Sequence, residues 1–218
     1  MARLLFIGCA LVAMLGSLIS AAGAEIGLAI VYDTSSSMRD AVRDIAGRGA
    51  PKYTIGNRAL LALIQRLEDF KQNNAGHLTA GLVVFDDRSA REAVRLGRCD
   101  TSELRIWAKS FTTPHGPTPL GPAMKVAADA LIGNGAPKRH VLVITDGENT
   151  AGPDPATVIA DLRAKGEEIA FHFIAFDLNA NVFRSIQELG ATVVSAADEE
   201  ELNKQVQFIL EEKILLEK

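Results

Sequence analysis

Short, nearly continuous apolar runs alternate along the chain with longer stretches in which apolar residues recur every three or four positions. The first pattern is typical of buried strands and the second of helices with one buried face. The sequence therefore predicts strands at residues 26–32, 79–85, 92–96, 140–145, 169–176 and 191–195. It predicts helices at residues 56–73, 101–110, 120–132, 154–165 and 179–189, and a last helix from residue 198.

Apolar strands that alternate with helices predict an α/β fold, with a Rossmann-like, doubly wound, mostly parallel sheet and helices on both faces. The strand at 92–96 follows its predecessor after a short turn, which favours an antiparallel pair at the sheet edge. For this class we expect the strand order 3-2-1-4-5-6. Residues 39–55 are polar and rich in glycine, so we expect a long loop there, with one helical turn at 40–46.

Residues 1–24 have a pattern of their own. Arg3 precedes an uncharged apolar run, and the small residues after it end in Ala-x-Ala at Ala24, directly before Glu25. This is the pattern of a cleaved secretory signal peptide. An uncleaved membrane anchor is the alternative, since the uncharged stretch nearly reaches spanning length, but almost no linker separates it from the first strand. We expect one domain at 25–218 in a periplasmic or secreted protein, with no membrane contact after cleavage.

Composition narrows the functional classes. Apolar residues make up 48% of the 218 positions and charged residues 23%, which suits one folded domain with a substantial core. The net charge is −4 and no Lys/Arg block occurs, so we expect neither nucleic acid nor an anionic membrane surface as a partner. Signal cleavage would leave Cys99 as the single cysteine, which we interpret as a structural thiol, with an intermolecular disulfide as the alternative.

The polar residues after the first strand carry the main chemical signal. Asp33 is followed by hydroxyls at Ser35 and Ser37, and alternating oxygens in a turn can converge on a hard cation such as Mg²⁺ or Ca²⁺. The alternative is a turn in which these side chains cap backbone N–H groups. Asp146 follows the fourth strand, so the expected strand order places the two acids side by side on one rim. Thr118, held between two prolines, leads into a helix on that rim.

Three segments in this order resemble the motifs of the von Willebrand factor type A domain, over Ile26 to about Phe208: Asp33-Thr34-Ser35-Ser36-Ser37, Thr118-Pro119-Leu120-Gly121 and Thr145-Asp146-Gly147. In that family they form a metal-ion-dependent adhesion site. The resemblance implies that the hydroxyls of Ser35, Ser37 and Thr118 contact the cation, and that Asp33 and Asp146 mainly hold metal-bound waters. Glycines usual in the family are replaced by Ser36 and Pro117, and neither replacement removes a ligand.

The resemblance also implies a function: a non-enzymatic, metal-dependent protein-binding module, used in adhesion, in interaction, or as an accessory in assembling a larger periplasmic system. Three neutral hydroxyls and two outer acids leave a divalent cation incompletely neutralised and able to keep exchangeable water, which favours Mg²⁺. Mn²⁺ and Ca²⁺ remain alternatives. We expect a partner protein that presents a Glu or Asp side chain to the ion.

A Mg²⁺-dependent phosphoryl-transfer or hydrolytic enzyme of haloacid-dehalogenase-like type is the competing hypothesis, because α/β folds of that type also place an Asp after the first strand. Those enzymes have a second acid two residues later, where this chain has Ser35. No obvious lysine or base motif completes the set. We therefore expect no catalytic residues and no organic cofactor.

The remaining polar candidates have weaker interpretations. Asp86-Asp87 is interpreted as a solvated turn, with a metal site as the alternative. His115 lies on the same loop as the candidate threonine and is a candidate for contact with a partner. We expect His172 to be a packed, neutral imidazole, and His77 and His140 to lie at element boundaries; no Cys/His spacing indicates zinc.

Overall fold

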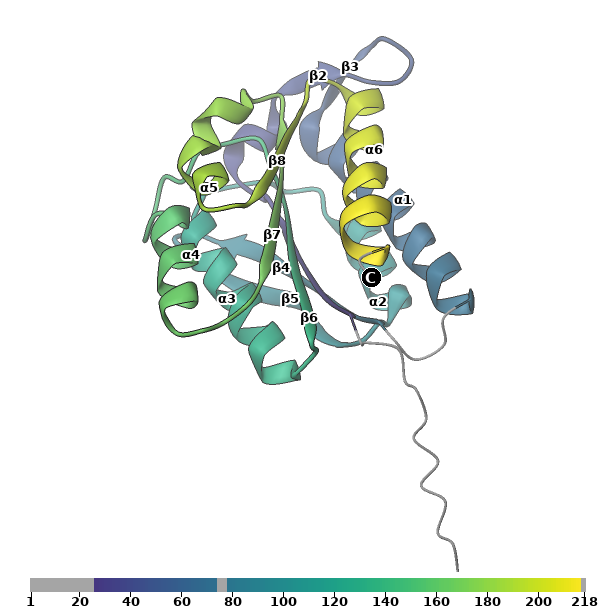
Figure 1. The fold of residues 1–218 in the computed structure, drawn as a ribbon. Coiled ribbons are helices and arrows are strands. Elements are labelled where there is room, and N and C mark those ends of the chain that lie inside the picture. The colour runs from purple at the N-terminus through teal and green to yellow at the C-terminus, as the bar shows by residue number, and fades with distance from the viewer. Residues whose placement is uncertain (1–25, 74–77, 217–218) are drawn as a thin grey trace, which may run out of the picture.

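The structure is a computed structural model that describes residues 26–73 and 78–216. The expected signal peptide at 1–24 and His77 lie outside the described residues. The described chain forms three layers, with a six-stranded sheet between two layers of helices (Figure 1). Within the described ranges, no helix combines the length and the apolar character needed to span a membrane.

The main sheet has the topology that the sequence predicts. Its strands are β1 (Ile26–Tyr32), β4 (Leu78–Asp86), β5 (Ser89–Arg98), β6 (Lys138–Thr145), β7 (Ala170–Phe176) and β8 (Thr192–Ala196). They lie in the order β5-β4-β1-β6-β7-β8, which is 3-2-1-4-5-6 when these strands are counted along the chain. The edge strand β5 is antiparallel to β4, and the other neighbouring strands are parallel. The α/β fold, the strand order and the antiparallel edge strand are confirmed.

Helices cover both faces of the sheet. One layer consists of α1 (Lys52–Asn73), α2 (Thr101–Ser110) and α6 (Glu199–Phe208), which continues as the π-helix η3 (Ile209–Leu215). The other layer consists of α3 (Leu120–Asn134), α4 (Pro155–Ala164) and α5 (Arg184–Glu188). Figure 1 shows the two layers on opposite sides of the strands.

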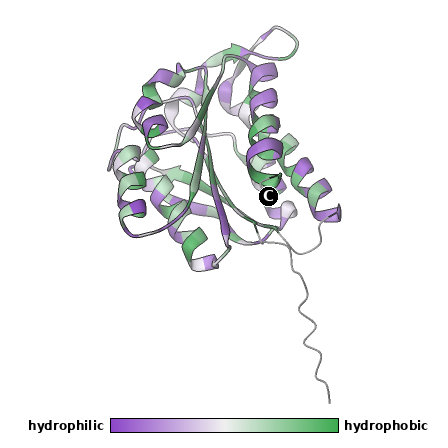
Figure 2. Cartoon of the chain, viewed as in Figure 1, coloured by the Kyte–Doolittle hydropathy of each residue, from purple (hydrophilic) through white to green (hydrophobic). Residues whose placement is uncertain are grey.

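The centre of the sheet joins two apolar cores. Every residue of β1 is buried, with Leu28 and Ile30 in the core beneath α1 and α6, and Ala29 and Val31 in the core beneath α3 and α4. This alternation explains why the strand is a continuous apolar run: both of its faces are covered. The hydropathy colouring shows apolar residues concentrated along the strands and polar residues on the outer sides of the helices (Figure 2).

Two helix predictions need correction. Helix α1 begins at Lys52, four positions before the predicted start. The helix predicted at 179–189 is instead a 3₁₀ turn, η2 (Ala180–Phe183), followed by the short α5. The Asn179 side chain accepts a hydrogen bond from the Asn181 N–H and caps this turn. The break lets the Phe183 ring pack against Phe173, with centroids 5.3 Å apart.

The loop predicted at 39–55 is also wrong. After a 3₁₀ turn, η1 (Ser36–Arg39), the chain forms a hairpin from β2 (Ala41–Arg43) and β3 (Gly49–Pro51) before it enters α1. The Asp44 carboxylate closes the hairpin tip by accepting hydrogen bonds from the N–H groups of Ala46 and Arg48. Gly47 takes the left-handed conformation that the tip requires, with φ of 76°.

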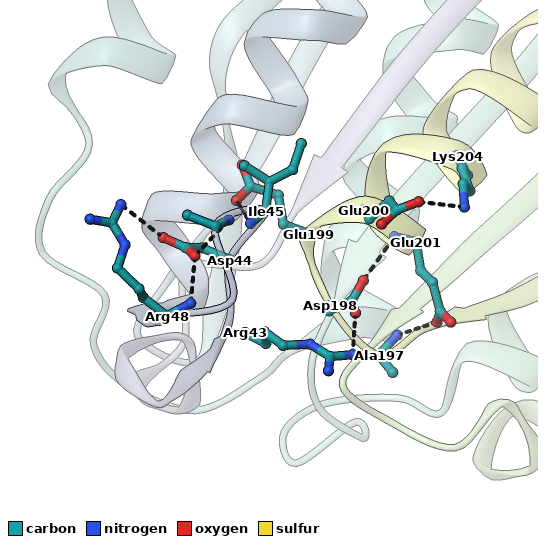
Figure 3. Close-up of polar contacts among 11 residues, drawn as sticks. Arg43, Asp44, Ile45, Arg48, Ala197, Asp198, Glu199, Glu200, Glu201 and Lys204 are labelled. Carbon is teal, nitrogen blue, oxygen red and sulfur yellow. Dashed lines mark hydrogen bonds and ion pairs between the residues drawn. The ribbon is translucent and has the colours of Figure 1, made fainter.

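The hairpin is fixed to the start of α6 (Figure 3). Arg43 pairs with Asp198 at 2.7 Å, and the Ile45 N–H donates to Glu199 Oε2 at 2.9 Å. Glu199 is itself buried and accepts two hydrogen bonds from the Arg58 guanidinium of α1. Hydrogen bonds and ion pairs therefore connect the hairpin to both α1 and α6.

His140 is not a boundary residue, as the sequence suggested, but lies buried in β6. Its Nδ1 is 3.2 Å from Nε2 of His172 in β7, and the two rings stack with centroids 5.5 Å apart; we call these two residues the histidine pair. Burial, followed by the charges of His140 and Lys213, lowers the pKa of His172 to about 3. This agrees with the packed, neutral imidazole predicted for His172.

Candidate functional site

Asp33 lies at the carboxyl end of the central strand and is fully buried. Its Oδ1 accepts a hydrogen bond from the Ser35 N–H at 2.7 Å, and its Oδ2 accepts one from the Thr145 hydroxyl at 2.6 Å. The Asp33 N–H in turn donates to the Ile144 carbonyl at 3.0 Å. These bonds fix the Asp33 carboxylate at the seam between β1 and β6.

Hydroxyl groups connect this turn to the acid that follows β6. The oxygens of Ser35 and Ser37 are 3.0 Å apart, and the Ser37 hydroxyl donates to Asp146 Oδ1 at 2.8 Å. Ser35 and Asp146 are buried, whereas Ser37 is half-buried. Four of the five residues that the sequence proposes as a site thus lie in direct succession along one rim of the sheet.

Thr118 completes the set, through a loop held from both sides. The Ser36 N–H donates to the Gly116 carbonyl and the His115 N–H to the Thr34 carbonyl, which joins the loop to the first turn. On its other side, Thr118 exchanges two hydrogen bonds with Thr150: its N–H donates to the Thr150 hydroxyl at 2.8 Å and its carbonyl accepts from the Thr150 N–H at 2.9 Å.

The Thr118 hydroxyl faces the same point as the serines. A Cβ atom built on Gly147 would lie 3.3 Å from the Thr118 Oγ1 and 3.9 Å from the Ser37 Oγ. Both hydroxyls therefore border the space beside Gly147, where an additional side-chain atom would crowd them. We call Asp33, Ser35, Ser37, Thr118 and Asp146 the rim cluster.

The two acids of the rim cluster are electrostatically strained without a cation. Burial, followed by the nearby charge of Asp146, raises the pKa of Asp33 to about 6, against the lowering effect of hydrogen bonds from Ser35 and Thr145. Burial also raises the pKa of Asp146, although the Ser37 hydroxyl and Lys52 oppose it. Two desolvated carboxylates close together create a negative site that attracts a positive ion.

The sequence analysis missed Lys52, which lies at this site. Its Nζ contacts Asp146 Oδ2 at 3.1 Å and Asp177 Oδ2 at 2.9 Å, and its side chain is only 7% exposed. Burial alone would lower the pKa of Lys52, but the hydrogen bonds and charges of Asp177 and Asp146 raise it above its ordinary value. One signal in the sequence could have revealed Lys52. A lysine in the first turn of a helix is disfavoured by the helix dipole, so its presence there indicates nearby acidic groups.

The donor chemistry of the rim cluster fits a hard divalent cation. In residues 26–73 and 78–216, no group of three or more His, Cys, Asp and Glu side chains could hold a metal ion. A cation at this rim therefore depends on the hydroxyl oxygens, with the two carboxylates close behind them. Oxygen ligands of this kind suit Mg²⁺, Mn²⁺ or Ca²⁺ better than a soft metal.

The other candidate residues lie outside this arrangement. The His115 side chain is 56% exposed, and its Nε2 is 4.0 Å from Asp87 Oδ1. This places the turn after β4 beside the Thr118 loop, so contact between His115 and a partner stays a prediction. Cys99 is buried in the core beneath α1 and α2. Burial raises the pKa of its thiol to about 11, as expected for an unreactive structural thiol.

Comparison with protein families gives one match to this chain: the sequence model of the von Willebrand factor type A domain matches residues 28–208. The matched range includes every residue of the rim cluster and all strands of the main sheet except the first two residues of β1. Comparison with curated protein sequences gives no match.

Solved structures share the fold at low sequence identity. The PilB minor pilin from Streptococcus sanguinis has a TM-score of 0.66 and 17% identity over 86% of this chain and 61% of that one, so the present chain spans less than two thirds of the pilin. A proximal thread matrix protein from the mussel byssus, with a zinc-occupied metal-ion-dependent adhesion site, has a TM-score of 0.65 and 18% identity over 86% of this chain and 47% of that one. The SpRpn10 VWA domain has a TM-score of 0.62 and 16% identity over 85% of this chain and 95% of that domain.

Proposed function

Because the chain belongs to the von Willebrand factor type A domain family, whose members are generally interaction modules and not enzymes, we propose that it is an exported, metal-dependent protein-binding module that captures a carboxylate of a partner protein. The observation that carries the proposal is the convergence of the rim cluster: three hydroxyls and two buried acids from three separate loops meet at one edge of the sheet. Hydrogen bonds between these loops support the proposal, because they hold the five residues together.

In this proposal the hydroxyls of Ser35, Ser37 and Thr118 bind the cation, and Asp33 and Asp146 compensate its charge and orient bound water. A divalent ion held there supplies an electrophilic centre for an external carboxylate. We propose Mg²⁺ as the ion, because three neutral direct ligands leave it several waters. A partner Glu or Asp then neutralises charge that the rim cluster leaves uncompensated, which an amide does far less well.

The structure gives a reason to prefer binding over catalysis. A haloacid-dehalogenase-like mechanism needs a lysine available to a phosphoryl group, and the lysine at this site already contacts two carboxylates. Lys52 is also almost fully buried, so it presents no free ammonium to a substrate. A phosphatase assay with Mg²⁺ separates the two functions: turnover lost in Asp33→Asn would favour the enzyme.

Export is the second part of the proposal. It is supported by the signal-like pattern of residues 1–24 and by the surface location that the names of two structural neighbours imply, a minor pilin and the pilus adhesin SpaC from Lactobacillus rhamnosus GG. N-terminal sequencing of the protein from the periplasm or medium tests it. Glu25 as the first residue is the expected result, and a full-length chain retained in the membrane would contradict it.

The binding proposal is tested with metal and carboxylate separately. Mg²⁺ and Mn²⁺ are first titrated into chelator-treated protein by calorimetry, which should show one site. The protein is then applied to arrays of peptides that carry Glu, with the matched Gln peptides and a chelated sample as controls. Binding that requires both Glu and Mg²⁺ supports the proposal, whereas equal binding to Gln peptides or in chelator contradicts it.

Two substitutions and a control assign the binding to the rim cluster. Asp33→Ala should abolish Mg²⁺ and peptide binding, because it removes the charge behind the ligands. Thr118→Ala should weaken both and leave the fold intact, because it removes one hydroxyl at the rim. Thr112→Ala, an exposed threonine of the same loop, should bind as the wild type does. Wild-type binding by Asp33→Ala would place recognition elsewhere on the surface.

A further inference from the structure

Lys52 occupies an unusual position for a lysine. It is the first residue of α1, where the helix dipole disfavours a positive charge, and its side chain is almost entirely buried. A buried ammonium is stable only when other groups compensate it. The two contacts to Asp146 and Asp177, at 3.1 and 2.9 Å, supply that compensation and join the start of α1 to the ends of β6 and β7.

The two carboxylate oxygens of Asp146 accept hydrogen bonds from different donors. Its Oδ1 accepts the hydrogen bond from the Ser37 hydroxyl, and its Oδ2 accepts the one from Lys52. Lys52 therefore holds the carboxylate in the orientation that aims its other oxygen at the serine. This links the lysine, through Asp146, to the position of a hydroxyl that borders the candidate metal site.

Asp177 supports the same arrangement from the other side. It is one of two described non-glycine residues with positive φ, at 51°, a conformation that costs energy for most side chains but that aspartate tolerates. Its N–H donates to the Ala196 carbonyl at 2.7 Å, which ties the turn to the end of β8. The turn thus directs the Asp177 carboxylate towards Lys52, although 45% of the Asp177 side chain is exposed.

We infer that Lys52 is an internal cation that keeps the rim cluster assembled without a divalent ion and lowers the affinity with which that ion binds. The inference rests on the proposed function in that it takes the rim cluster as the metal site. In metal-free protein, the ammonium compensates part of the charge of Asp146 and holds that carboxylate in place. In metal-bound protein, the same ammonium is a fixed positive charge close to the ion and repels it.

The consequence is a site that binds its ion weakly but is ready for it. A site without such a lysine would hold the ion more tightly and lose its shape when the ion leaves. Lys52 lowers the metal affinity, but it also holds the ligands in place before the ion binds. Fewer side chains then have to be ordered when the ion binds.

The test compares Lys52→Met with wild type in the full chain, each measured in chelator and in Mn²⁺. Methionine keeps most of the length and apolar volume of the lysine stem and removes its charge. The matched control is Lys125→Met, which removes an exposed lysine that pairs with Asp129 on the outside of α3. Mn²⁺ affinity is measured by electron paramagnetic resonance, and thermal unfolding midpoints are measured with and without Mn²⁺.

We expect Lys52→Met to bind Mn²⁺ at least tenfold more tightly than wild type. In chelator, its unfolding midpoint should be lower and hydrogen exchange at Ser35 to Ser37 faster than in wild type, and Mn²⁺ should raise its midpoint by more. Lys125→Met should match wild type in all these measurements. Unchanged or weaker Mn²⁺ affinity in a folded Lys52→Met variant would overturn the inference.

Asp177→Asn gives a second measurement if Lys52→Met fails to fold. It removes the competing acid, so that Lys52 acts on Asp146 alone, and Mn²⁺ affinity should fall severalfold; tighter binding would overturn the inference. If wild type binds no Mn²⁺, the proposed metal function fails, while hydrogen exchange in chelator still tests whether Lys52 assembles the rim cluster. Exchange at Ser35 to Ser37 that is unchanged in both variants would then reject that role.

Discussion

Two buried polar groupings in this domain involve the neighbouring strands β6 and β7, yet they treat charge in opposite ways. The rim cluster keeps two carboxylates beside hydroxyl groups, and a lysine contacts one of the two, Asp146. In the histidine pair, burial lowers the pKa of His172 to about 3, so its imidazole stays neutral near neutral pH. Burial favours the neutral form in both places, so the difference lies in what surrounds each group. The rim retains ionised groups, whereas the surroundings of His172 favour its neutral form.

The two groupings therefore affect stability with opposite pH dependence. The pKa of Asp33 is raised from 3.8 to about 6, so its contribution to the stability of metal-free protein is full below pH 3.8 and is lost as the pH rises towards 6. The pKa of His172 is lowered from 6.5 to about 3, so its contribution is full above pH 6.5 and is lost as the pH falls towards 3. Substitutions can separate these two slopes.

The largest effect is expected from breaking the ion pair behind the rim. Asp146→Ala should destabilise metal-free protein by about 3 kcal/mol, because it leaves the buried Lys52 with one partly exposed partner. Urea unfolding in chelator measures it. The control, Asp129→Ala, removes an exposed partner of Lys125 and should cost less than about 0.5 kcal/mol. Equal losses in the two variants would show that the buried pair contributes no more than a surface pair.

Asp33→Asn should stabilise metal-free protein near neutral pH by about 2 kcal/mol, since it removes a carboxylate that is ionised at this pH although burial disfavours its charge. The Thr145 hydroxyl has an alternative acceptor in the Gly147 carbonyl at 3.1 Å, so it can accept from the new amide. The same variant should lose all stabilisation by Mg²⁺. Paired thermal scans with and without Mg²⁺ measure both effects. A variant less stable than wild type in chelator would contradict the account of the rim as a strained site.

His172→Phe should flatten the acid side of the stability curve. In wild type, His172 accounts for a loss of about 1 kcal/mol between pH 6.5 and about pH 5.5, and this loss should disappear in the variant. Urea midpoints across this range measure it, preferably in the Asp33→Asn background, where the opposing slope is absent. His115→Phe is the control, since it makes the same substitution at an exposed histidine outside the core. A slope that survives His172→Phe must come from other groups.

The smallest loss of stability is expected at an exposed ion pair. This loss is the reference against which the substitutions in the two buried groupings are compared. Arg43→Ala removes the pair with Asp198, and because 69% of the arginine side chain is exposed, stability should stay close to that of wild type. Asp198 keeps its hydrogen bond from the Glu201 N–H at the start of α6. Urea unfolding measures the change, and a loss as large as that of Asp146→Ala would show that the hairpin contributes to the stability of the domain.

The fold was predictable because long apolar runs specify buried parallel strands, and the order of strands and helices then leaves few topologies. The rim cluster was predictable for a related reason, since strand order determines which loop ends meet. Lys52 was not, because its partners are a residue 94 positions away and the turn after β7. Only packing of α1 on the sheet brings them together, and a lysine in a polar stretch has no distinctive pattern.

The sequence analysis did not predict the hairpin or the buried position of His140, and both reasons are local. Strands β2 and β3 have three residues each and only Val42 among them is buried, which is too short for a periodic signal. His140 looked like an end residue because it precedes the apolar run, but parallel pairing extends β6 two residues further, to Lys138. Pairing along the sheet, and not the composition of the segment, decides where these elements begin.

The direction in which the sheet runs has a practical consequence for biosensor work. Strand β1 begins at Ile26, at the end of the sheet opposite the rim, and α6 starts beside the hairpin and runs, through η3, towards that same opposite end (Figure 1). Protein coupled to a sensor surface through a tag near either described end should therefore lie in one orientation, with the loops of the rim cluster facing the flow. Random coupling through exposed lysines would instead give mixed orientations and place part of the rim cluster against the chip.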